Sequence, residues 1–306
     1  MDLENGDLEN GDAVTIGFCR LSQFKALLVG LVVADAASHG VFRDPRLRPC
    51  PQAQQKDLQQ EDSRQANFHQ EDFLGLKEDL KNLKSLSWRQ NLVMEAHWTI
   101  AIAQGLALAT PPLQQGNSLE VIALVPTMLR HLDEPQVGAQ VLAGRCSGEA
   151  TAEFRAGVQG LYQGLRSHLT PNVHQFPLIP QSPWPPWDQA FTLFQASGGD
   201  FTLTLAQSLR QASDPVVPLL AALLSTGQRG LGTIPIPWRQ AIDRGLNYRS
   251  NWGPDGGQTP PSSLQQRWHL QGEAEILDLA TGLWQAWAGI ISGGSDVCLP
   301  IPSRRS

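Results

Sequence analysis

Residues 198–239 decide the fold of this chain of 306 residues, and they read GGDFTLTLAQSLRQASDPVVPLLAALLSTGQRGLGTIPIPWR. Apolar residues recur there with helical spacing over 200–212 and 215–226, and a further helical pattern covers 237–247. Asp214 stands directly before Pro215, an order typical of a helix start, because proline fits the first helical position. The stretch therefore predicts consecutive helices joined by short turns.

The same spacing recurs over the rest of the chain. Near the N-terminus, Phe24, Leu27, Leu28, Leu31 and Val32 predict a helix over 21–39. Further helices are predicted over 71–86, 88–109, 117–131, 135–144, 148–168, 187–196 and 272–290. Nothing alternates convincingly with the period of two that marks a strand. We therefore predict an all-α fold.

We expect a single compact multi-helix domain over residues 20–295, because no linker separates two self-sufficient cores. It is flanked by an acidic tail over 1–19, predicted to be disordered, and by a C-terminal tail over 296–306. Residues 43–70 contain prolines and a Gln-rich, charged stretch, which indicates a solvated insertion.

A segment rich in proline and tryptophan, FPLIPQSPWPPW at 176–187, interrupts the helical patterns. It has two interpretations. It is a rigid cover that packs Trp184 and Trp187 onto the core, or it is a polyproline II ligand for a partner protein. The lack of flanking basic residues favours the cover.

Charge and apolar composition restrict the possible partners. The net charge is −6, from 23 Lys and Arg against 29 Asp and Glu, which argues against the basic surface of a nucleic-acid-binding protein. The apolar run Ala26–Ala37 is shorter than the roughly 20 residues of a membrane span and contains Asp35, so it indicates a buried helix. The four cysteines form no C-x-x-C pair. We expect reduced thiols and a cytoplasmic protein.

Two stretches resemble the ADP-ribosylglycohydrolase family. Residues 198–239 are similar to its late motif: Ser213-Asp214 matches an Asp-containing turn, 221–224 matches an Ala/Leu-rich helix, and 230–238 matches a Gly-Leu-x-x-Ile-Pro turn followed by Trp. Residues 30–36, GLVVADA, resemble the family's N-terminal G-x-x-x-G-D-A motif. The resemblance implies the family's helical fold and makes Asp35, Ser213 and Asp214 the candidate ligand-binding residues.

The resemblance also implies two divalent ions, such as Mg²⁺, that activate water for attack on ADP-ribose. This chain departs from that pattern. The late motif has Ala212 and Pro215 where the family has a carboxylate and a hydroxyl residue, so Asp214 is the retained metal-ligand candidate. The early motif should fall within 85–94, which offers no carboxylate pair and places Arg89 where cations should sit.

Three hypotheses follow. The main one is a catalytically inactive member of the family, with no catalytic residue and no cofactor, that binds an ADP-ribose-like molecule or a protein partner. The second is a Mg²⁺-dependent hydrolase with a rearranged site that borrows Glu71, Asp72 or Glu95. The third is a helical scaffold unrelated to the family. For Asp214 itself, a helix-capping role is an alternative to ligand binding.

Overall fold

The computed structural model describes residues 9–42, 87–106, 118–146, 150–169, 184–244 and 263–290, with side chains from Arg20 onwards. Of these residues 79% are α-helical, and none lies in a strand. The predicted all-α class is confirmed. The predicted helix over 71–86 and the insertion over 43–70 lie outside the described ranges.

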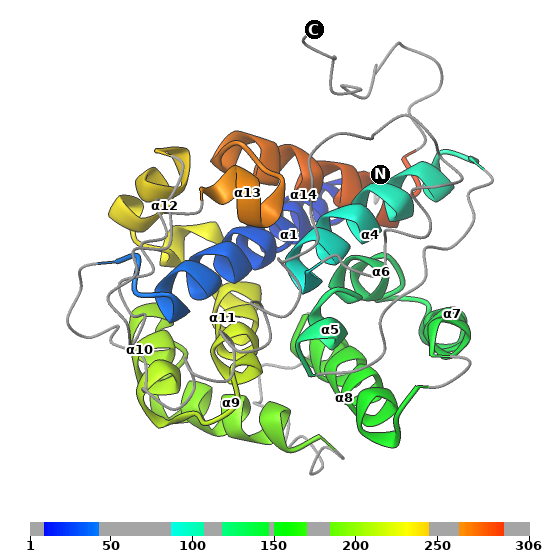
Figure 1. Cartoon of the computed structure of the whole chain (residues 1–306). Coiled ribbons are helices and arrows are strands. Elements are labelled where there is room, and N and C mark those ends of the chain that lie inside the picture. The colour runs from blue at the N-terminus through cyan, green and yellow to red at the C-terminus, as the bar shows by residue number, and fades with distance from the viewer. Residues whose placement is uncertain are drawn as a thin grey trace, which may run out of the picture.

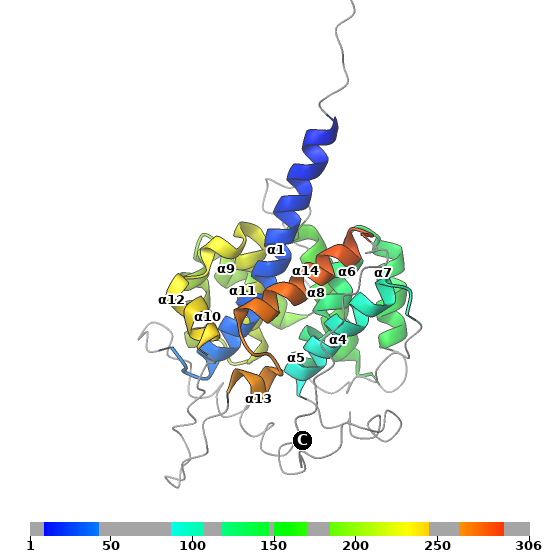
Figure 2. The ribbon, with the colours of Figure 1, turned by 90° about the horizontal axis from the view of Figure 1, so that it is seen from above.

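The first helix, α1 (Glu9–Ser38), runs through the centre of the molecule. It starts earlier than the predicted residue 21, so residues 9–19 of the predicted tail are helical. No proline interrupts this stretch, and extending an existing helix is far easier than starting one. Figure 2 shows its N-terminal part extending beyond the other helices.

The remaining helices pack around α1, and their order is visible in Figure 1. They are α4 (Trp88–Ala103), α5 (Ser118–Ile122), α6 (Val125–Arg130), α7 (Pro135–Arg145), α8 (Ala152–Leu169), α9 (Pro185–Ala196), α10 (Phe201–Gln211), α11 (Val216–Arg229), the 3-10 turn η3 (Leu231–Thr233), α12 (Ile236–Asp243), α13 (Leu264–Trp268) and α14 (Glu273–Trp287). Helices α11 and α14 make the most extensive contacts with α1.

Two local differences from the prediction have identifiable causes. The helix predicted over 117–131 is divided into α5 and α6, because Pro126 has no N–H to donate to the carbonyl oxygen of Ile122. The short helix α13 was not predicted. It begins with a capping box in which the side chains of Ser263 and Gln266 bind each other's backbone N–H groups.

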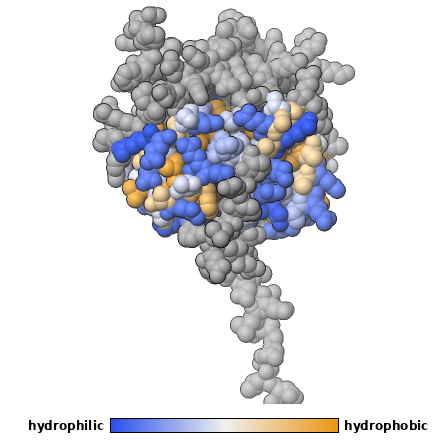
Figure 3. All heavy atoms as spheres, turned by 90° about the horizontal axis from the view of Figure 1, so that it is seen from below, coloured by the Kyte–Doolittle hydropathy of each residue, from blue (hydrophilic) through white to orange (hydrophobic). Residues whose placement is uncertain are grey.

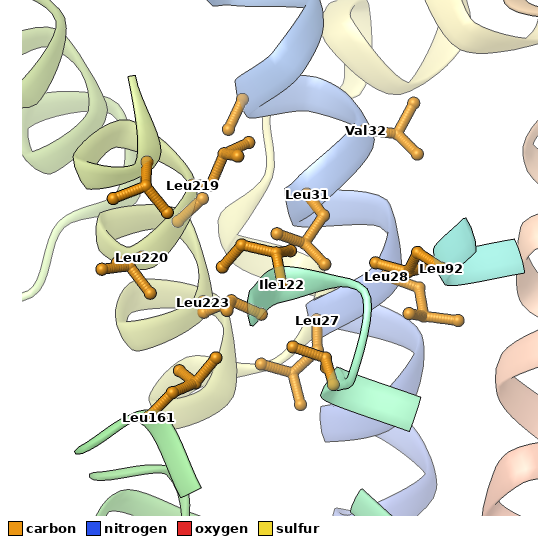
Figure 4. Packing of buried hydrophobic residues seen from close by; sticks show 14 of the residues in the cluster. Leu27, Leu28, Leu31, Val32, Leu92, Ile122, Leu161, Leu219, Leu220 and Leu223 are labelled. Carbon is orange, nitrogen blue, oxygen red and sulfur yellow. The ribbon is translucent and has the colours of Figure 1, made fainter. Parts of the chain in front are cut away.

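The core lies between α1 and its neighbours (Figure 4). Leu27 and Leu31 of α1 are fully buried and face Leu219 and Leu223 of α11, while Leu92 of α4 lies on the other side of α1. Such side chains each contribute roughly 1.5–3 kcal/mol through burial. On the face that Figure 3 shows, hydrophilic side chains are interspersed with smaller apolar areas.

The two tryptophans of the Pro/Trp segment are buried in the core. Trp184 packs against Gly157 of α8, and Trp187 packs so closely on Gly164 that a Cβ atom there would lie 2.0 Å from the indole ring. The predicted packing of Trp184 and Trp187 onto the core is confirmed. Residues 176–183 lie outside the described ranges.

Among the described residues one helical segment, Arg20–Ser38, is long and apolar enough to cross a membrane, with a mean hydropathy of 1.4. Within the protein 72% of that window is buried. The central helix of a core has the same composition, so the segment fits its place between α11 and α14.

Candidate functional site

Asp35, the candidate from the N-terminal motif, lies on the last turns of α1 and is buried. Arg89 of α4 donates to its Oδ1 from Nε at 2.9 Å and from Nη2 at 2.6 Å. Trp268 of α13 donates to Oδ2 from its indole Nε1 at 2.8 Å. Both carboxylate oxygens therefore accept hydrogen bonds, and the carboxylate joins three helices that are distant in sequence.

The positions of these donors follow from local structure. Helix α4 begins with a capping box between Ser87 and Gln90, which fixes its first turn and places Arg89 there. Helix α13 ends at Trp268 because the next residue, His269, has φ 56° and is left-handed. The ring of His269 contacts the Gln90 side chain at 2.7 Å, which links the end of α13 to the start of α4.

His39 and Arg267 extend the cluster. Arg267 Nη2 lies 2.7 Å from His39 Nε2 and 4.0 Å from Asp35 Oδ1, and His39 Nδ1 lies 2.9 Å from the Asp35 carbonyl oxygen. His39 Nδ1 also lies 3.5 Å from Asp35 Oδ1, so both Arg267 and His39 lie beside this carboxylate.

The electrostatics of Asp35 result from two opposing effects. Burial raises the pKa of this carboxyl, and the positive charges of Arg89 and Arg267 lower it by more. The pKa of Asp35 therefore lies well below its ordinary value, and the group is ionised at neutral pH. Trp88 and Trp268 lie beside the Asp35–Arg89 ion pair. Their rings meet edge to face at 5.3 Å, and the Arg89 guanidinium lies 4.8 Å from the centre of the Trp88 ring.

The late motif has a different role in the structure. Asp214 Oδ1 accepts a hydrogen bond from the backbone N–H of Val216, the first residue of α11, at 2.9 Å, and it accepts another from Ser118 of α5 at 3.4 Å. The N-cap of α11 is Pro215, one residue later than predicted, and Asp214 precedes it with its carboxylate bound to the first backbone N–H of the helix. Ser213 beside it is exposed, and Ala212 is buried.

The candidates therefore converge in part. Asp35 meets the start of α4 through Arg89, whereas the carboxylate of Asp214 binds the starts of α11 and α5. In the part of the chain that the structure describes, no three His, Cys, Asp or Glu side chains are grouped so that they could hold a metal ion. Glu71 and Asp72 lie outside that part.

Glu95, the third carboxylate weighed for a rearranged site, is buried on α4 beside Arg145 of α7. The hydroxyl of Thr127 donates to its other oxygen. Burial raises the pKa of Glu95, and Arg145 and Thr127 oppose that shift without cancelling it. The sequence analysis considered Glu95 as a possible metal ligand in a rearranged hydrolase site. Its polar character within the apolar stretch 88–103 indicates burial with a partner, but not which partner.

A small pocket of about 30 Å³ among the described residues lies away from this cluster. It runs between the C-terminal turns of α4 and α14, and it is lined by Ile100, Ala103, Gln104, Gly282, Gln285, Ala286, Gly289 and Ile290. None of these side chains titrates, so the polar cluster at Asp35 is the better candidate for a functional site.

No protein-family model, no curated protein and no solved structure matches this chain. The resemblance to the ADP-ribosylglycohydrolase family therefore rests on the two sequence motifs.

Proposed function

We propose that this chain is a catalytically inactive ADP-ribosylglycohydrolase-like protein that binds an ADP-ribose-like ligand without a metal ion. The observation that carries the proposal is the pairing of Asp35 with Arg89. The guanidinium group holds the carboxylate of the N-terminal motif directly, and it comes from the stretch that supplies metal ligands in the family that the chain resembles.

Charge supports this interpretation. A divalent ion requires several carboxylate oxygens around it, and a fixed guanidinium group beside the carboxylate repels it. Two arginines, Arg89 and Arg267, approach Asp35 within 4.0 Å, and the Asp35 oxygens accept from Arg89 and Trp268. Asp214 binds the first backbone N–H of α11. Each motif carboxylate thus has a structural role that is independent of a cation.

The alternative of a rearranged hydrolase finds less support. Glu95 is paired with Arg145 in the same way as Asp35 is paired with Arg89, so it also carries a guanidinium group where a metal ion would have to bind. The proposed ligand is a small molecule with the chemistry of ADP-ribose, and the proposed location is the cytoplasm.

Two measurements test the proposal. First, the protein is incubated with ADP-ribosyl-arginine and Mg²⁺ or Mn²⁺, and release of ADP-ribose is followed; we expect no metal-dependent release. Second, ADP-ribose is titrated by calorimetry with Mg²⁺ and again with EDTA, and we expect the same binding heat in both. The double variant Asp35→Leu with Arg89→Met, which removes both members of the ion pair together, is the control for the role of the guanidinium group.

Each outcome separates the three hypotheses. Release that depends on the metal ion would establish the hydrolase and overturn the proposal. A flat ADP-ribose titration under both conditions would also overturn it, in favour of a helical scaffold unrelated to the family.

A further inference from the structure

Two polar side chains at the start of α4 have no hydrogen-bond partner among the described residues. They are the indole Nε1 of Trp88, a donor, and the amide Oδ1 of Asn91, an acceptor. Both residues are deeply buried, with exposed fractions of 4% and 2%. Buried polar atoms are nearly always hydrogen-bonded, so this pair requires an explanation.

The two residues stand three positions apart on one helix. Residues at i and i+3 lie on the same face, with Cβ atoms roughly 5–6 Å apart. Helix α4 contacts α5 and α13 as well as α6 and α14, and Figure 2 shows α4 running between α13 and α7. A donor and an acceptor are thus placed on one face of the helix at its buried end.

The neighbouring tryptophan provides the contrast. Trp268 meets Trp88 edge to face, and its Nε1 donates to Asp35 Oδ2 at 2.8 Å. Trp187 also has an unpartnered Nε1, but its surroundings are the apolar face of α8 at Gly164. Trp88 differs from Trp187 because a buried acceptor follows one helical turn later.

We infer that Trp88 and Asn91 form a binding site for a hydroxyl oxygen. Such an oxygen accepts a hydrogen bond from the indole N–H with one lone pair and donates its proton to the amide oxygen, so it satisfies both atoms. The hydroxyl belongs to a ribose of the ligand or to an internal water molecule. The ribose source rests on the proposed function, and the water source does not.

The test uses the full chain with ¹⁵N-labelled tryptophan, observed by NMR at the indole N–H groups. Trp88→Phe identifies the Trp88 signal, and Trp268→Phe identifies that of Trp268, the internal control whose N–H is already bonded to Asp35. One arm titrates ADP-ribose. The other arm measures cross-relaxation between the Trp88 indole proton and a long-lived water molecule in the ligand-free protein.

We expect the Trp88 signal to move on titration while the Trp268 signal moves much less. Asn91→Leu, which keeps the side-chain size and removes the acceptor, should weaken ADP-ribose binding by about tenfold, the loss of roughly one hydrogen bond. An unchanged Trp268 signal verifies that this variant is folded.

The outcomes are distinct. A water cross-peak without any response to ADP-ribose supports the site with water as its occupant, and a flat ADP-ribose calorimetric titration would then count against the proposed function alone. If the wild-type Trp88 signal neither responds to ADP-ribose nor shows a water cross-peak, the inference is wrong. The wild-type arms decide this even if Asn91→Leu fails to fold.

Discussion

Helix α4 contributes one residue to each of two buried arginine–carboxylate pairs. The pairs are similarly buried, but the pKa values of their carboxyl groups shift in opposite directions. In the first pair Arg89 of α4 binds Asp35 of α1, and in the second Glu95 of α4 binds Arg145 of α7. All four side chains are less than 5% exposed. The pKa of Asp35 nevertheless lies well below its ordinary value, whereas the pKa of Glu95 is raised.

The difference lies in the partners. Asp35 has two arginines within 4.0 Å and His39 beside it, and their attraction outweighs the desolvation of the carboxylate. Glu95 has one arginine and the neutral hydroxyl of Thr127, and desolvation prevails. Burial alone therefore does not determine the direction in which a carboxyl pKa shifts, because the cations around the group oppose the effect of burial.

The most severe test of this comparison is Asp35→Asn. It leaves Arg89 buried beside a neutral amide, so we expect the free energy of unfolding to fall by about 3–5 kcal/mol, measured by urea denaturation. The double variant Asp35→Leu with Arg89→Met replaces the pair by apolar groups and should recover part of the loss, since Trp268 and Arg267 still lack the carboxylate. A single variant as stable as the wild type would refute the role of the pair.

Trp268→Phe removes one donor from the Asp35 carboxylate and keeps an aromatic ring. A hydrogen bond to a charged group contributes about 1.5–3 kcal/mol, so we expect a loss of about 2 kcal/mol beyond that of the control Trp187→Phe. Trp187 is equally buried, but its Nε1 has no partner among the described residues. Equal losses in the two variants would show that Asp35 gains nothing from the indole.

The pH dependence of the free energy of unfolding tests the lowered pKa of Asp35. A carboxyl with a lowered folded pKa stabilises the protein above its unfolded pKa, and that contribution is lost as the pH falls towards the folded pKa. The stability difference between the wild type and Asp35→Asn should therefore be constant above about pH 5 and narrow below about pH 4, by about 1.4 kcal/mol per pH unit. A difference that does not change between pH 5 and pH 3 would contradict the lowered pKa of Asp35.

Glu95→Gln should have the smallest effect. Since the pKa of Glu95 is raised in the folded protein, its ionised form is no better accommodated there than its neutral form. Gln keeps the shape and an acceptor oxygen, so we expect thermal denaturation at pH 7 to show a change below about 1 kcal/mol. A loss as large as that of Asp35→Asn would show that the two pairs are equivalent, which would end the comparison.

Much of the fold was predictable from spacing. Helices α4, α7, α8, α9, α10, α11 and α14 fall where the apolar spacing of the sequence places them. The break at Pro126 and the short α13 were missed, since a five-residue helix has too few turns to show a period and depends on its capping box. The early start of α1 at Glu9 was missed because the acidic, Gly-containing sequence there resembles a tail.

The candidate site was predictable only as a set of residues. The sequence placed Asp35, Asp214 and the start of α4 in one site and identified Arg89 as a positive charge there. Arg89 does bind Asp35, whereas Asp214 binds the starts of α11 and α5. It gave no signal for Trp268 or Arg267, which reach Asp35 from more than 200 positions away. The Ser-Asp-Pro order located the start of α11, and Asp214 binds the first N–H of that helix, although the N-cap itself is Pro215.

The sequence by itself determined the helical class, most helix positions and the approximate start of α11, because these depend on residues within one or two turns of each other. The tertiary structure decided which carboxylate meets which arginine. That choice depends on the packing of α1, α4 and α13, and on the number of cations that this packing brings to one buried carboxylate. The spacing of apolar residues indicates the buried face of each helix. The ionised state of Asp35 depends on the packing of α1, α4 and α13, which brings the cations to this carboxylate.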